Sequence, residues 1–332
     1  MLAFIRQRFF IAIPLLVMIS IASFVIILLP PGSYVETYIQ RLEEQGFLAN
    51  ESVIEQLYRQ YGLDRSPVMQ YWLWMRNFLT KGEMGRSFIY SMPVTDIIME
   101  RLPLSIAFTF AAFALTWIIA VPLGIYSAVR QYSLTDYVAT TMSFIGLAVP
   151  NFLLALGLAY VVFVNTGHAI TSLYSLEFRN APWSWAKLVD VAKNAWLAVF
   201  VIAVGGTAPL VRILRGTLLD ELKKLYVTTA RAKGLNETRV IFKYPVRIAF
   251  NPLISTIGWT LPALVSGEVI VSRVLGLETL GPVLLEAALS EDMYLVGSIV
   301  MILSGLIVVG TLVSDVLLAV IDPRIRFGRS AS

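Results

Sequence analysis

The chain of 332 residues contains no cysteine, a single histidine and few charged side chains. Without cysteine it forms no disulfide, thiolate zinc site or iron–sulfur centre, and it has no cysteine nucleophile. One histidine, His168, cannot supply a histidine cluster for a metal, and it leaves no credible Ser/His/Asp set for hydrolysis. The sequence therefore predicts no catalytic residue and no metal site.

Charge is scarce as well, since 14% of the residues are charged and 57% are hydrophobic, whereas soluble domains are about 25% charged. With a mean hydropathy of +0.74, this is the composition of an integral membrane protein. Uncharged runs long enough to cross about 30 Å of hydrocarbon as helices predict an all-α fold. Six transmembrane helices are expected, at residues 9–29, 102–129, 137–164, 194–211, 248–271 and 293–321.

The charges between these spans predict their orientation. One face carries 15 Lys and Arg against five Asp and Glu, and it consists of residues 1–8, 130–137, 212–249 and 322–332. The other face carries 11 basic and 15 acidic residues, in segments 30–101, 165–193 and 272–292. The positive-inside rule places both termini and the 212–249 loop in the cytoplasm. The basic pI of about 9.2 therefore reflects topology, and no nucleic acid is expected as a partner.

Residues 30–101 form an external domain, and stretches 51–61 and 68–79 within it look helical. Two interpretations stay open: a cap that packs on the spans, or a docking surface for an external partner. The tryptophans near the outer interface are expected to anchor helices at headgroup level. They are Trp72, Trp74, Trp183 and Trp185.

The sequence also lacks a motif that would supply energy for transport across the membrane. No Gly-Lys dipeptide occurs in the chain, so it lacks the P-loop that cradles ATP phosphates. Carriers driven by protons or sodium need ionisable residues in the middle of the bilayer. The spans here are nearly charge-free, and Glu268, Arg273 and Asp315 lie near span ends. This pattern favours ATP hydrolysis on another subunit over a self-sufficient secondary transporter of a small polar solute, which is the alternative function.

The loop at 212–249 is basic but patterned. Residues spaced by four, four, three and four positions predict one face of a helix that continues out of the fourth span. These residues are Leu214, Leu218, Leu222, Leu225 and Thr229.

A turn and a second helix follow in the same loop. Gly234 suits a left-handed helix end, and Asn236 can cap a second helix that begins near Glu237 and runs until Pro245. The small side chains of Ala230 and Ala232 near the tip are expected to permit close approach by another protein. The alternative is a solvated basic loop.

The stretch Tyr226-Val227-Thr228-Thr229-Ala230-Arg231-Ala232-Lys233-Gly234-Leu235 resembles the cytoplasmic signature of permease subunits of bacterial peptide-type ABC importers, the dipeptide, oligopeptide and nickel family. Further matches occur in order along nearly the whole chain. They include Tyr61-Gly62-Leu63-Asp64, Arg101-Leu102-Pro103 and Ile321-Asp322-Pro323-Arg324-Ile325-Arg326-Phe327. The chain is most similar to the permease that carries the large external loop.

The resemblance implies a type I ABC importer permease fold, with multiple spans in the inner membrane of a bacterium or archaeon. It implies a second homologous permease subunit, two ATP-binding subunits and an external solute-binding protein as partners. ATP and Mg would be bound by the partners, so that this chain carries no cofactor and is not an enzyme. Coupling to the ATPase would fall to Thr228, Thr229, Ala230, Arg231, Ala232, Lys233, Gly234 and Leu235.

Many peptide permeases have the pattern Glu, aromatic, Pro-Gly-Leu-Gly after the fifth span. This chain departs from that pattern and reads Ser272-Arg273-Val274-Leu275-Gly276-Leu277 there. Glu268 and Ser272 are expected to lie along the translocation path near its outer end. The departure leaves two substrate classes open, oligopeptides and oligosaccharides. A membrane scaffold without transport is a third possibility.

Overall fold

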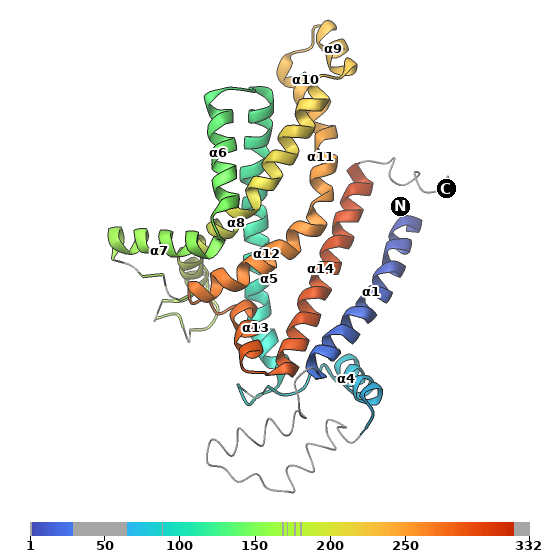
Figure 1. Ribbon diagram of the computed structural model, residues 1–332, viewed down its shortest axis with the longest axis vertical. Coiled ribbons are helices and arrows are strands. Elements are labelled where there is room, and N and C mark those ends of the chain that lie inside the picture. The colour runs from blue at the N-terminus through green and yellow to red at the C-terminus, as the bar shows by residue number, and fades with distance from the viewer. Residues whose placement is uncertain are drawn as a thin grey trace. The chain divides into compact units, whose positions relative to one another are not determined.

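The computed structural model describes residues 2–28, 65–87, 89–167, 169–170, 172–175, 177–179 and 181–321. Nearly all of them are helical (Figure 1), and the single isolated bridge between β-type residues in these ranges joins Arg86 to Pro93. The helices are α1 (Leu2–Leu28), α4 (Pro67–Lys81), α5 (Val94–Val129), α6 (Leu134–Ala148), α7 (Asn151–Thr166), α8 (Trp185–Leu222), α9 (Leu225–Ala232), α10 (Glu237–Lys243), α11 (Pro245–Ser255), α12 (Ile257–Val274), α13 (Leu280–Leu289) and α14 (Met293–Ile321). The expected all-α class is confirmed.

Four of the described helices are long and apolar enough to cross a membrane singly: α1, α5, α8 and α14. They contain most of the predicted first, second, fourth and sixth spans. The bent pair α6 and α7 gives a fifth span if the two count as one. The predicted fifth span, 248–271, falls on α11 and α12, which separate at Thr256. The division of the chain into six spans stays a prediction.

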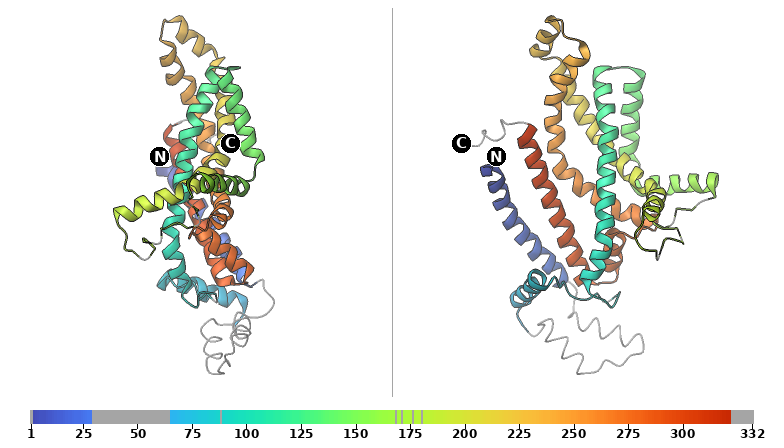
Figure 2. Two further views of the ribbon diagram at one scale, coloured as in Figure 1. Left: turned by 90° about the vertical axis from the view of Figure 1, so that its left-hand side faces the viewer. Right: turned by 180° about the vertical axis from the view of Figure 1, so that it is seen from behind.

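The predicted third span, 137–164, is not one straight helix. Its two halves, α6 and α7, meet at an angle of 106°, and Figure 2 shows α7 turned away from the axis of α6. Val149 is extended and Pro150 precedes α7. Proline has no N–H to donate to the preceding turn, and it disfavours helical geometry in the residue before it. Pro150 therefore accounts for the break between α6 and α7.

The chain divides into two compact units. Unit 1 comprises Met1–Phe10, Leu104–Gly281 and Ile307–Ser332, and α8 packs against several of its other helices. Leucines on α8 that are completely buried pack against α5, α11 and α12. They are Leu197, Leu210, Leu214 and Leu218. Small residues bring the helices close, since a Cβ on Gly206 would lie 3.2 Å from Oγ1 of Thr116 on α5.

Unit 2 comprises Ile11–Pro103 and Pro282–Leu306, and in it α4 packs on the last turns of α1. The Phe24 ring lies 5.6 Å from the rings of both Tyr71 and Trp74, and the Tyr71 hydroxyl is 2.7 Å from Oγ of Ser20. The helix predicted at 68–79 is confirmed by α4, whereas the stretch 51–61 and His168 lie outside the described residues. Trp74 is buried, with Nε1 donating to the Met84 carbonyl, so this ring is not the interfacial anchor that the sequence suggested.

The carboxylate of Asp292 fixes the loop that follows α4 in unit 2. It accepts hydrogen bonds from Oγ of Ser87 at 2.6 Å, from the backbone N–H of Ile89 at 3.2 Å and from that of Leu295 at 3.3 Å. Asp292 is fully buried, and these donors satisfy its oxygens as a buried carboxylate requires.

Candidate functional site

The segment after α8 folds as predicted into two short helices joined by a tight turn. We call residues 225–243, which comprise α9, the turn and α10, the α9/α10 elbow. Gly234 in the turn has φ +74°, a left-handed conformation that glycine adopts at no steric cost. Oδ1 of Asn236 accepts a hydrogen bond from the backbone N–H of Thr238 at 3.0 Å, which caps α10. Figure 1 shows the elbow at the joined ends of α8 and α11.

One part of the sequence prediction for this segment is wrong. The helix face expected to run through Leu225 and Thr229 stops at Leu222, where α8 ends, and α9 begins in a new direction after Lys223 and Lys224. Leu225 is consequently 84% exposed instead of packed. The spacing was compatible with one helix, but the spacing alone could not reveal the turn.

The elbow has a small core of its own. Val227 and Ala230 of α9 pack with Val240 of α10, and all three are buried. Tyr226 and Tyr244 pack at the edge of this core and are partly buried. The Tyr226 hydroxyl donates to Oε2 of Glu221 on α8 at 2.5 Å. Burial, and then the neighbouring carboxylate, raise the pKa of Tyr226 above its ordinary value. The tyrosine is therefore held neutral as a donor that ties α9 to α8.

An ion pair closes the elbow across the turn. Nη2 of Arg231 lies 2.6 Å from Oε1 of Glu237, and Nε donates to both carboxylate oxygens at 3.0 to 3.1 Å. This hydrogen-bonded guanidinium lowers the pKa of Glu237 and the carboxylate raises that of Arg231. Both side chains are about half exposed, so the pair orients the two helices more than it stabilises them.

The eight predicted coupling residues divide into an outer and an inner group. The outer group is exposed and consists of Thr228, Thr229, Arg231, Ala232, Lys233 and Gly234. Ala230 is buried in the elbow and Leu235 packs against its core.

Two large apolar side chains of the elbow are also exposed: Leu225, and Phe242 at 57% exposure. The sequence analysis did not identify them as site residues, because a leucine or phenylalanine at helical spacing predicts a buried core position. The exposed residues of the elbow therefore include apolar, basic and small side chains.

The two residues predicted to lie along the translocation path are close together on α12. Oγ of Ser272 donates to Oε1 of Glu268 at 3.4 Å. Their exposed fractions are 2% for Glu268 and 0% for Ser272. In this conformation unit 1 thus encloses both side chains, and their role in transport stays a prediction. In the described part of the chain no three carboxylate or imidazole groups gather to hold a metal ion.

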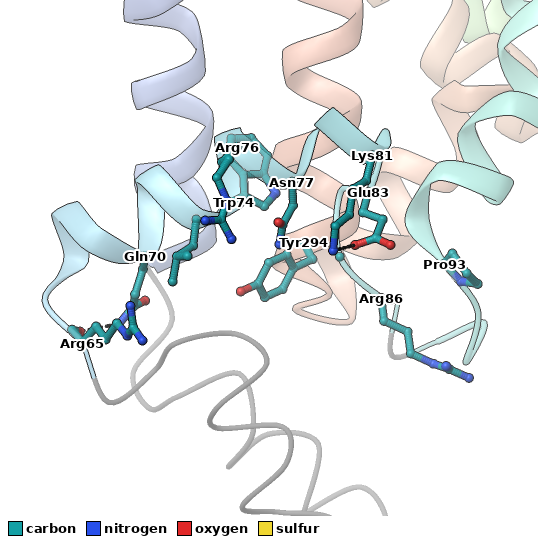
Figure 3. A pocket seen from close by; sticks show the side chains of 12 residues that line it. Arg65, Gln70, Trp74, Arg76, Asn77, Lys81, Glu83, Arg86, Pro93 and Tyr294 are labelled. Carbon is teal, nitrogen blue, oxygen red and sulfur yellow. Dashed lines mark hydrogen bonds and ion pairs between the residues drawn. The ribbon is translucent and has the colours of Figure 1, made fainter. Parts of the chain in front are cut away.

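A basic pocket of about 580 Å³ lies in unit 2 between α4, the loop after it and Tyr294. Figure 3 shows its cations, which are Arg65, Arg76, Lys81 and Arg86. The lining contains one carboxylate, Glu83, whose Oε2 is 3.9 Å from Nζ of Lys81. The sequence analysis did not identify this pocket, which forms where residues 65–93 meet Tyr294 of α14.

Comparison with known proteins places the chain in a family. Residues 120–327 match the profile of binding-protein-dependent transport system inner membrane components, and residues 1–109 match the N-terminal profile of such membrane components. The chain belongs to this family. The resemblance to ABC importer permeases deduced from its motifs is thereby confirmed, as is its place among multi-pass inner membrane proteins.

Relatives match over nearly their whole length. The oligopeptide transport system permease protein AppB of Bacillus subtilis is 35% identical over 328 residues, which cover 98% of this chain and 100% of AppB. The oligopeptide transport system permease protein OppB of Haemophilus influenzae is 30% identical, with the same coverage of both chains. A structure of the MetNI methionine ABC transporter in an inward-facing conformation matches with a TM-score of 0.54 and 15% identity, over 68% of this chain and 96% of that one. This likeness shows the type I importer permease fold.

Proposed function

We propose that this family member is the permease subunit of an ABC importer for oligopeptides, driven by ATP hydrolysis on partner subunits. AppB and OppB, which align from end to end, are both named as oligopeptide permeases. These names favour peptides over the oligosaccharides that the sequence left open.

The observation that carries the ATP coupling is the α9/α10 elbow. It joins α8 through two residues and α11 through one, Tyr244. With its own buried core and cross-turn ion pair it moves as a rigid piece, and short connections transmit its movement to the helices on either side. A partner that grips Leu225, Phe242 and the exposed coupling residues between them therefore changes the tilt of α8 and α11.

The proposal includes a defined set of partners. Two ATP-binding subunits carry ATP and Mg, a second homologous permease completes the path, and an external solute-binding protein delivers the peptide. The elbow and both chain termini then lie in the cytoplasm, as the charge distribution of the loops predicts. Alternation of access between the two sides follows closure of the ATP-binding subunits.

The test is uptake by membrane vesicles from cells that carry this chain with its native partners. Vesicles loaded with ATP are expected to accumulate alanine-based tri-, tetra- and pentapeptides when the binding protein is present outside, and vesicles loaded with a non-hydrolysable analogue are not. Uptake that follows an ion gradient and ignores ATP would instead identify a secondary transporter.

A further inference from the structure

The break between α6 and α7 opens into a cavity of about 320 Å³ inside unit 1. Its walls come from the break itself, from α8 and from α12. The lining includes Gly146, Leu147, Pro150, Asn151, Gly205 and Thr260. No ionisable side chain contributes to the lining.

The cavity lies deep in the apolar part of the unit. The 15 residues of α6 rise about 22 Å, so the break is well inside a hydrocarbon layer about 30 Å thick. Gly205 is near the middle of α8, Trp185–Leu222. A break in a membrane helix frees backbone groups, and such irregular backbone is tolerated where it is covered by protein or lines a polar cavity. In broken-helix transporters these positions are where solutes bind.

Asn151 places an amide in this cavity. A Cβ added at Gly205 would lie 2.5 Å from Oδ1 of Asn151, and one added at Gly267 would lie 3.4 Å from its Nδ2. The amide therefore sits against α8 and α12 in space that two glycines leave. Within the ranges that the structure describes, no protein group hydrogen-bonds to it, although it is only partly exposed. A polar group without a partner at this depth is costly unless something that enters the cavity pairs with it.

The chemistry of the cavity matches a peptide backbone. A side-chain amide offers one acceptor oxygen and two N–H donors, so it can pair with both the N–H and the C=O of a single peptide group. This pairing ignores the peptide's side chains. Walls of glycine and small apolar residues leave room for varied side chains, and the lack of charge means that a charged terminus is not held there.

We propose that Asn151 and the α6/α7 break form a contact site for the backbone of the transported peptide. The inference rests on the proposed function and adds the position of the substrate within it. Asn151 binds substrate there and takes no part in coupling.

Uptake of the alanine peptides by ATP-loaded vesicles gives the first readout. Asn151→Leu keeps the branched shape of the side chain and removes both hydrogen bonds, so uptake is expected to fall about thirtyfold if each bond contributes about 1 kcal/mol. The matched control is Asn165→Leu in the same helix, because the exposed Asn165 amide bonds to the Val161 carbonyl outside the cavity. This control is expected to transport as the parent does.

The absence of native cysteine allows a second readout that does not depend on transport rate. Leu147→Cys places a thiol in the cavity wall, and Leu153→Cys places one on the exposed part of α7 outside the lining. In the assembled complex the peptides are expected to slow modification of the Leu147→Cys thiol by a water-soluble thiosulfonate and to leave the Leu153→Cys thiol unaffected. Adding Asn151→Leu is expected to abolish that protection.

The outcomes separate the two proposals. If the parent vesicles take up no peptide, the proposed function fails without reference to any variant. If the parent transports and the Asn151→Leu variant transports equally, or if peptides leave the Leu147→Cys thiol unprotected, the contact site is refuted and the importer stands. A cavity filled by water or lipid alone gives this second result.

Discussion

The guanidinium of Arg215 on α8 grips the carboxylate of Asp136 on α6 with two parallel hydrogen bonds, Nε to Oδ1 at 2.8 Å and Nη2 to Oδ2 at 2.9 Å. The backbone N–H of Tyr132 adds a third bond at 2.9 Å. The Asp136 side chain is only 4% exposed, so its charge depends on these partners. The pair fixes the start of the broken span to the helix that leads to the elbow.

Removal of Arg215 is therefore expected to be costly. Arg215→Ala leaves a buried carboxylate without a counter-charge and should lower the free energy of unfolding by about 3 kcal/mol. The control is Arg212→Ala, one turn earlier on α8, where the guanidinium is exposed and stacks 5.8 Å from the Phe144 ring. Its loss should cost less than about 1 kcal/mol. Equal midpoints for both variants in denaturant unfolding of the purified protein would contradict the argument.

Gly234 is expected to be essential for coupling because of its left-handed backbone conformation and not because of close neighbouring atoms. No atom lies within 4 Å of the position of a Cβ there, but φ is +74°, and a β-branched residue pays about 1–2 kcal/mol in that conformation. Gly234→Val should abolish peptide-stimulated ATP hydrolysis by the complex. Gly216→Val on α8 also points into open space and has ordinary helical geometry, so it should retain stimulation. Normal stimulation in the Gly234→Val complex would show that the turn is not needed.

The exposed Leu225 and Phe242 are expected to contribute to docking and not to folding. Truncating both to alanine should change the free energy of unfolding by less than about 0.5 kcal/mol. It should weaken retention of the ATP-binding subunits by more than about tenfold, as loss of anchor residues does at other interfaces. Leu134→Ala provides the control, since Leu134 is 79% exposed at the start of α6. Retention by pull-down at graded detergent concentrations measures the effect, and unchanged retention in the double variant would remove these residues from the interface.

Close packing of α14 on α1 in unit 2 depends on Gly297. A Cβ there would lie 2.8 Å from the backbone carbonyl oxygen of Ser23 and 2.6 Å from Cγ1 of Ile27. The carbonyl cannot move without shifting α1, so Gly297→Ala should destabilise the protein by about 1–3 kcal/mol. Gly305 on the same helix has no neighbour within 4 Å of a Cβ. Gly305→Ala should therefore be neutral or slightly stabilising in thermal unfolding, because alanine has the higher helix propensity. A loss equal to that of Gly297→Ala would contradict the packing explanation.

Features of the elbow set by local chemistry could be predicted from the sequence. Gly234 and Asn236 act on their own neighbours, so the turn and the cap of α10 follow from residue type. The end of α8 at Leu222 could not be predicted in this way. Only tertiary packing, such as the bond from Tyr226 to Glu221 and the small core around Val227, decides that α9 takes a new direction.

In the membrane helices, too, some features could be predicted from local sequence and others depend on packing between distant segments. Hydropathy located the long helices, and Pro150 carried a signal for the break that the length of the apolar run concealed. The cavity beside Asn151 needs Gly205 and Gly267 from two other helices, which no local pattern brings together. The basic pocket in unit 2 likewise needs Tyr294, which is distant in sequence from the stretch 65–93 that supplies the rest of its lining.

The most direct test of the importer is to place a photo-crosslinking amino acid at Ala232, on the exposed part of the elbow, and at the exposed Leu188 near the other end of α8 as the control. After irradiation in the native membrane, mass spectrometry identifies every chain joined to the tagged protein or retained with it in mild detergent. The account predicts that the Ala232 probe captures an ATP-binding subunit, that the Leu188 probe does not, and that a second permease copurifies. Recovery of this chain alone, able to transport in liposomes without ATP, would contradict it.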